Sequence, residues 1–217
     1  MNNARDYAER RARRARPTII AVTLMLFTAV HSSAAAQAPK SKPRASAPAA
    51  APVRPTPGAG PVIVVDTVKG TFAFETYPTD APKTVEHVVR LVKRGFYNGQ
   101  RVHRAVPNFV VQMGDPQTRD MTKREWWGRG DRAGSGTPVG AAEISKKRLH
   151  TAGAVAMAHA GDPAQADAQF YVTLAAKPAL NGKYAVFGRV IEGLDVPAKL
   201  QVGDMIKKVS IRTTPQS

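Results

Sequence analysis

The sequence contains no cysteine among its 217 residues. This absence excludes a disulfide framework, a thiolate metal site, a cysteine nucleophile and a lipid-modified N-terminal cysteine. Long apolar runs are also missing: the longest, residues 19–30, is shorter than the roughly 18–20 residues that cross a bilayer. The remaining composition, 43% hydrophobic and 22% charged, is that of a globular protein and not of a disordered chain.

Several motifs that carry enzyme chemistry are absent. Gly182 and Lys183 are followed by Tyr184, so there is no phosphate-binding loop, and Ser135 does not lie in a Gly-x-Ser-x-Gly nucleophile turn. The four histidines after residue 60 show neither helical metal spacing nor a paired carboxylate. The sequence therefore predicts no metal site and no cofactor.

Negative charge is scarce, since 32 basic residues oppose 16 acidic ones and give a net charge of +16. Half of this excess lies in residues 1–16 and 37–60, outside the region that looks folded. A nucleic-acid or anionic-surface binder is the function that such a charge suggests first. That function requires basic residues gathered on one face, which the sequence does not show, so we expect no specific nucleic-acid partner.

Residues 1–36 have the layout of a secretory signal peptide. Six arginines precede Pro17, the apolar stretch 19–30 follows, and Ala34, Ala35 and Ala36 offer the small residues that a signal peptidase accepts. This predicts export to the periplasm, with no membrane span left after cleavage near Ala36. An uncleaved N-terminal anchor is the alternative, because the arginine-rich region is long; a twin-arginine route fits the following residues poorly.

Residues 37–60 form a linker rich in alanine and proline, with Val53 as their one large apolar side chain. Such a stretch cannot bury enough surface to offset the entropy of ordering, and its prolines favour an extended chain. Residues 61–217 then form the folded domain.

Short strand-like runs dominate that domain, at 62–67, 71–75, 101–106, 109–113, 153–158, 169–174, 184–190 and 205–212. Lys69-Gly70 is a hairpin signal between the first two. One clear helix is predicted to begin just after Asp80, which would cap it, and it carries an apolar stripe of valines. A second, shorter helix is predicted over 194–202. Many strands without regular β-α-β alternation predict a mainly β fold, an antiparallel barrel with helices covering its open ends.

The segment 102–116 places Arg104, Phe109 and Gln112 close together, because two strands joined at Pro107-Asn108 would bring Arg104 beside Gln112. Together with the runs AMAHAG (156–161), AQFYVTL (168–174) and LNGKYAVFGRV (180–190), it resembles the cyclophilin family of peptidyl-prolyl cis–trans isomerases over residues 61–212. The resemblance implies a closed eight-stranded antiparallel β-barrel capped by two α-helices, with a groove on its outer face.

The resemblance also implies the site residues. Arg104 and Gln112 match the catalytic positions of the family. The substrate-binding positions are matched by Phe109, Val110, Ala158, His159, Tyr171, Leu180 and Tyr184.

These residue types suit rotation about a prolyl bond. An amide resists rotation by about 18–20 kcal/mol because the nitrogen lone pair is delocalised into the carbonyl. Twisting returns the lone pair to nitrogen, so a guanidinium aimed at that nitrogen binds the twisted form best and lowers the barrier. The predicted function is therefore isomerisation of X-Pro bonds in proline-containing or unfolded polypeptides, assisting folding, by a monomer. A non-catalytic peptide-binding or chaperone module that keeps the groove is the alternative.

Some positions depart from the family pattern. Ala179 stands where a tryptophan is frequent in members that bind cyclosporin, so we expect weak cyclosporin binding. Met113 and Ala168 replace a common glycine and a common serine near the groove, where they would alter substrate choice. Residues 117–137 match poorly, and we expect a loop at the rim of the groove.

Overall fold

The computed structural model describes residue 58, residues 60–130 and residues 133–212. The predicted signal peptide, 1–36, and nearly all of the predicted linker, 37–60, lie outside these ranges. Within them, no helix has both the length and the apolar character needed to cross a membrane.

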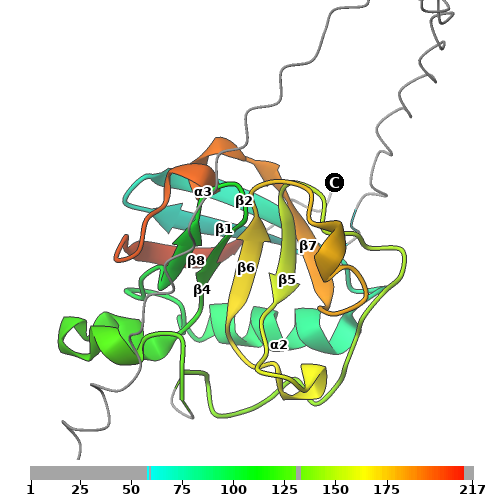
Figure 1. Ribbon diagram of the computed structural model, residues 1–217, viewed down its shortest axis with the longest axis horizontal. Coiled ribbons are helices and arrows are strands. Elements are labelled where there is room, and N and C mark those ends of the chain that lie inside the picture. The colour runs from blue at the N-terminus through cyan, green and yellow to red at the C-terminus, as the bar shows by residue number, and fades with distance from the viewer. Residues whose placement is uncertain (1–57, 59, 131–132, 213–217) are drawn as a thin grey trace, which may run out of the picture. The chain divides into compact units, whose positions relative to one another are not determined.

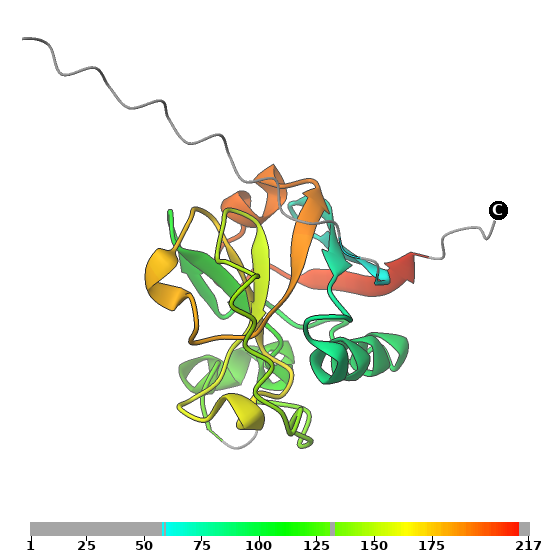
Figure 2. The same cartoon turned by 90° about the vertical axis from the view of Figure 1, so that its right-hand side faces the viewer.

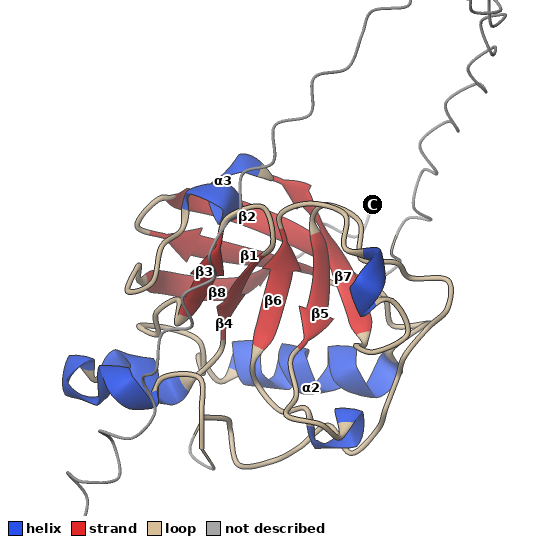
Figure 3. Cartoon of the chain, in the orientation of Figure 1, coloured by secondary structure: helices blue, strands red, loops and turns tan. Residues whose placement is uncertain are grey.

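Eight strands form one antiparallel sheet, as the sequence predicts (Figure 3). They are β1 (Val62–Thr67), β2 (Gly70–Thr76), β3 (Arg104–Val106), β4 (Val110–Met113), β5 (Ala154–Met157), β6 (Phe170–Thr173), β7 (Val186–Glu192) and β8 (Ile206–Arg212). Their order across the sheet is β3-β4-β6-β5-β7-β2-β1-β8. The predicted hairpin is present, since Thr67 pairs with Gly70 at the β1–β2 turn.

The sheet curls into a barrel that is closed only loosely at one seam. Between β3 and β8 there is no ladder of paired strands; the single bridge Arg101–Met205 and a few backbone hydrogen bonds, such as that from Val102 N–H to Asp204 O at 3.0 Å, join the edges. The prediction of an eight-stranded barrel is thus confirmed, while full closure overstated the pairing at this seam.

Helix α2 (Pro82–Lys93) covers one end of the barrel (Figure 1), and Figure 2 shows it below the strands from the side. Its valine stripe packs inward, with Val85, Val88 and Val92 buried. The expected capping by Asp80 is wrong. Asp80 forms an ion pair with Arg148 at 2.7 Å instead.

The free N–H groups at the start of α2 are satisfied by a residue far along the chain. The Glu143 carboxylate accepts hydrogen bonds from Lys83 N–H at 3.0 Å and from Thr84 N–H at 2.8 Å. A carboxylate at the positive end of a helix is favourable, so this contact replaces the local cap. The partners lie about 60 residues apart in the chain, so the sequence alone does not predict this cap.

The second helix is shorter than predicted. Helix α3 (Asp195–Lys199) lies at the opposite end of the barrel from α2 (Figure 1), and Leu200 already has extended backbone angles. Residues 117–137 are not wholly irregular either, because they contribute to two 3-10 helices, η1 (Pro116–Arg119) and η2 (Met121–Trp126). Two further 3-10 helices are η3 (Pro163–Gln165) and η4 (Pro178–Leu180).

The barrel interior is filled by side chains. Phe74, Phe170 and Phe187 form an aromatic cluster with ring centroids 6.0–6.3 Å apart. Met113 is fully buried in this same core, so its side chain does not line the groove as expected. Because buried side chains fill the interior, we expect a binding site on the outer surface.

Candidate functional site

The β3–β4 hairpin places the two predicted catalytic residues side by side. Arg104 and Gln112 are partners in the antiparallel register, so both side chains leave the same face of the sheet. The turn between the strands is tight: Asn108 has a φ of 57°, and Phe109 N–H donates to Val106 O at 3.0 Å. Asparagine tolerates this left-handed backbone better than most residues do.

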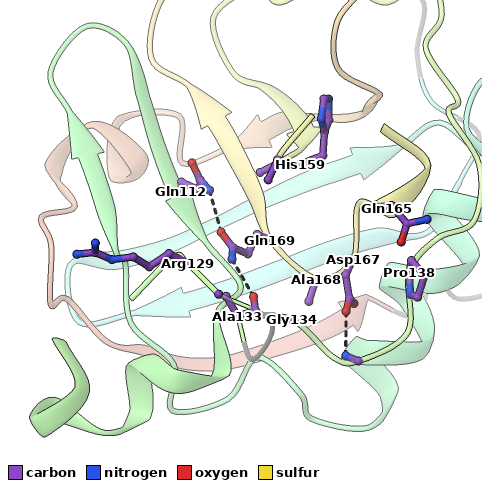
Figure 4. Close-up of a pocket in the computed structure, with 15 residues that line it drawn as sticks. Gln112, Arg129, Ala133, Gly134, Pro138, His159, Gln165, Asp167, Ala168 and Gln169 are labelled. Atoms are coloured by element: carbon purple, nitrogen blue, oxygen red, sulfur yellow. Dashed lines mark hydrogen bonds between the residues drawn. The ribbon is translucent and has the colours of Figure 1, made fainter. Parts of the chain in front are cut away.

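Gln112 is held by a chain of amide hydrogen bonds (Figure 4). Its Nε2 donates to Gln169 Oε1 at 2.9 Å, and Gln169 Nε2 donates to Ala133 O at 2.8 Å. The strand β4 can approach residues 168–169 because Gly114 follows it; a Cβ there would lie 2.3 Å from Ala168 O. The hydrogen bond to Gln169, which this close approach allows, orients the Gln112 side chain.

A pocket of about 150 Å³ opens beside this hairpin on the outer face of the sheet. It is lined by all nine residues that the sequence predicts for the site: Arg104, Phe109, Val110, Gln112, Ala158, His159, Tyr171, Leu180 and Tyr184. The apolar members belong to a second hydrophobic cluster, separate from the barrel interior. The pocket thus combines an apolar wall with a cation and an amide at its edge.

Tyr171 is braced from behind by His150, which the sequence analysis did not single out. The Tyr171 hydroxyl lies 2.9 Å from His150 Nε2, and His150 Nδ1 lies 3.1 Å from Asn181 Oδ1. Burial raises the pKa of Tyr171 and lowers that of His150, so both groups are neutral at pH 7. Tyr171 O–H then donates to Nε2, and Nδ1–H donates to Asn181, which leaves this polar group fully paired.

His159 and Tyr184 form the opposite wall. Their ring centroids are 4.6 Å apart, and His159 Nε2 lies 3.0 Å from Lys183 O, to which it can donate. Tyr171 and Tyr184 meet edge to face, with centroids 5.7 Å apart. These contacts give the pocket rigid aromatic walls.

A second, larger pocket of about 530 Å³ adjoins the first and shares Gln112, Ala158 and His159 with it (Figure 4). The glycine-rich segment after η2 supplies much of its lining, including Arg129, so the expected rim position of this segment agrees with the geometry. Ala168 lines this pocket, beside the small one.

A buried carboxylate anchors the rim. Asp115 accepts hydrogen bonds from Gln117 N–H at 2.8 Å and from Gly128 N–H at 2.6 Å. His103 lies nearby, and neither of its ring nitrogens has a hydrogen-bond partner among the described residues. Burial lowers the pKa of His103 to about 4, although the charge of Asp115 opposes the shift. The imidazole beside Arg104 is therefore neutral at physiological pH.

Within the described ranges, no group of three or more histidine, aspartate or glutamate side chains is arranged to hold a metal ion. What the pocket offers is a guanidinium, an oriented amide and an apolar cavity.

Residues 62–215 match the family described as cyclophilin type peptidyl-prolyl cis-trans isomerase/CLD. The chain belongs to the cyclophilins. A probable peptidyl-prolyl cis-trans isomerase of Brucella abortus is 34% identical over 150 residues, which cover 69% of this chain and 76% of that protein. A peptidyl-prolyl cis-trans isomerase-like 1 of Aspergillus niger is 40% identical over 135 residues, 62% of this chain and 77% of that one.

Solved cyclophilin structures share the fold. The isomerase of Cryptosporidium parvum superposes with a TM-score of 0.60 at 23% identity, covering 71% of this chain and 99% of its own. A second structure of that protein was determined in the presence of the dipeptide Ala-Pro. A cyclophilin of Hirschia baltica gives a TM-score of 0.55 at 25% identity, covering 71% of this chain and 75% of its own.

This cyclophilin is therefore a peptidyl-prolyl cis–trans isomerase, as the sequence predicts. The sequence analysis missed two supporting residues, Gln169 and His150. Gln169 was within reach of sequence reasoning, because it lies two positions before Tyr171 and strand alternation puts both on one face. His150 gave no such signal, since it lies in a loop.

Proposed function

We propose that Arg104 is the catalytic residue of this isomerase. Its guanidinium is exposed at the pocket edge, and no carboxylate of the described residues neutralises it. A substrate proline ring seated on Phe109 would bring its nitrogen within reach of the guanidinium. Because the lone pair of that nitrogen becomes available only when the amide twists, the hydrogen bond forms mainly in the transition state and lowers its energy selectively.

The other pocket residues hold the substrate in this proposal. Phe109, Leu180 and the tyrosines enclose the proline ring, and Val110 and Ala158 contribute to the apolar wall. Gln112, oriented by Gln169, donates or accepts hydrogen bonds on the polar side of the amide. The geometry of Arg104 beside Phe109 is the observation that carries the proposal.

The proposed clients are extended or unfolded polypeptides that contain proline. The small pocket lies next to a second, larger cavity with which it shares Gln112, Ala158 and His159, which suits a chain lying across both. The Ala-Pro dipeptide used with the Cryptosporidium relative supports proline-containing peptides as ligands. The signal-like residues 1–36 support export to the periplasm, where the protein would assist folding as a monomer.

The decisive experiment compares the parent chain with Arg104→Ala in an isomerase assay on a short X-Pro peptide, together with thermal melts and peptide affinity. We expect the variant to fold and to bind peptide while losing most of its turnover. A folded variant with parental turnover would remove Arg104 from the mechanism, and a parent that binds without turnover would favour the peptide-binding or chaperone module.

A further inference from the structure

Two positive charges flank Phe109, the proposed seat of the substrate proline. Arg104 Cζ lies 5.5 Å from the centroid of the Phe109 ring, and Lys177 Nζ lies 5.6 Å from it. Arg104 has a proposed chemical role, whereas Lys177 has none. Because Lys177 lies beside the same ring, its charge can affect which substrates bind there.

The position of Lys177 is fixed by its backbone. Lys177 N–H donates to His150 O at 2.7 Å, and Lys177 directly precedes η4, whose Leu180 N–H donates back to Lys177 O at 3.0 Å. His150 in turn is tied to Tyr171 and Asn181. The backbone of Lys177 is therefore hydrogen-bonded to the residue that also holds Tyr171, a wall of the apolar pocket.

Among the described residues, no acidic side chain pairs with this charge. The nine residues that line the small pocket include no aspartate or glutamate. Over the described ranges, neither Lys177 nor Arg104 forms an ion pair with a carboxylate. Asp167, the one acidic residue among the described residues that line the adjoining cavity, already accepts hydrogen bonds from Ser135 Oγ at 2.5 Å and Gly136 N–H at 2.9 Å.

We propose that Lys177 is a specificity-determining residue that favours substrates with an acidic side chain directly before or after the isomerised proline. The inference rests on the proposed seating of that proline on Phe109. Adjacent Cα atoms lie about 3.8 Å apart, so a glutamate next to the proline can bring its carboxylate as close to Lys177 as the ring itself. One such pair in a partly solvated groove changes kcat/KM by roughly three- to tenfold.

The predicted linker of this chain has the opposite charge to the substrates that Lys177 would favour. Residues 37–60 contain four basic residues and no acid, and Arg54 directly precedes Pro55. A tethered proline-rich segment reaches a high effective concentration near its own domain and would compete with clients. A cationic groove disfavours this basic linker and leaves the site open to acidic clients.

The test uses the full chain and four peptides of the form acetyl-Ala-X-Pro-Z-Ala-amide, with Glu or Gln at X or Z and Ala at the other position. NMR exchange spectroscopy gives kcat/KM for each. We expect Glu to exceed Gln by roughly three- to tenfold at one of the two positions in about 20 mM salt, and the ratio to shrink in about 0.5 M salt. Lys177→Gln should bring the ratio close to one, whereas Lys177→Arg should keep it.

Lys69→Gln is the matched control, because Lys69 is an exposed lysine in the distant β1–β2 turn. It should keep both the rate and the ratio. Equal parental rates on the Glu and Gln peptides, or a preference that Lys177→Gln leaves intact, would overturn the inference while turnover of the Gln peptides still demonstrates the isomerase. A linker peptide of residues 50–59 should likewise exchange more slowly at Pro55 than its Arg54→Glu counterpart.

Discussion

The guanidinium of Arg104 and the ring of Phe109 lie 5.5 Å apart, since Arg104 begins β3 and Phe109 lies in the turn that leads from β3 to β4. This arrangement places a permanent positive charge beside the apolar surface proposed to hold the proline. In the proposed mechanism the charge of Arg104 serves turnover and the ring of Phe109 serves binding. Substitutions of the two residues should therefore affect kcat and KM differently.

Arg104→Ala should lower kcat/KM by about 10²–10³, because it removes one charged hydrogen bond made mainly in the transition state. Arg104→Lys should recover little, since a compact ammonium group cannot reproduce the planar fork of the guanidinium. Isomerase kinetics measure both effects. Unchanged thermal melts would show that the loss is chemical, as the exposed position of Arg104 leads us to expect.

Phe109→Ala should act mainly on substrate binding. Removing the ring empties the floor of the pocket and removes roughly 1.5–3 kcal/mol of apolar burial, or about 10–150-fold in KM. Leu194→Ala is a suitable control, because Leu194 is an exposed apolar residue beside α3, 51% accessible. A fall in kcat with KM unchanged would contradict a role of Phe109 in binding.

Cyclosporin should inhibit this protein weakly. Ala179 is exposed in η4, next to the pocket residue Leu180, and it offers neither the cover nor the N–H donor of an indole. Ala179→Trp should tighten inhibition, as titration of the isomerase activity would measure. Tight inhibition of the parent chain would show that this position does not control the affinity.

Stability should fall as the pH is lowered from about 6.5 to 4. The folded pKa of His103, about 4, lies below the ordinary value of 6.5, so the unfolded chain binds the proton more readily in that interval. The shift corresponds to a loss of up to about 3 kcal/mol of unfolding free energy. Denaturant titrations across this range measure the slope, and His103→Phe should flatten it. An equally steep slope in the variant would assign the effect to other groups.

Export should leave a mature chain that begins close to Gln37. The arginine-rich start, the apolar stretch and the alanines at 34–36 motivate cleavage there. N-terminal sequencing of protein recovered from the cell envelope checks this directly. Recovery of intact Met1 in the membrane fraction would identify residues 1–36 as an anchor.

Strand content was accessible from the sequence because its signals are local, and the site was accessible through the motifs that resemble the cyclophilins. Short strand-like runs between turn residues located all eight strands to within a few positions, and the hairpin at Pro107-Asn108 put Arg104 opposite Gln112. The apolar stripe of α2 was equally clear. Its cap was not, because Glu143 reaches the helix from a distant loop while Asp80, the obvious candidate nearby, pairs with Arg148.

The residue types at the groove, and through them the resemblance to the cyclophilins that implies the reaction, are contained in the sequence itself, because the motifs at 102–116, 156–161, 168–174 and 180–190 carry those residues in order. Only the tertiary structure decided that Met113 points into the core, that His150 braces Tyr171, and that Lys177 stands beside Phe109. Each of these depends on how strands and loops from distant parts of the chain pack together. A contact between segments far apart in the chain produces no periodic pattern in the sequence of either segment. Such contacts can therefore be identified only in the folded barrel.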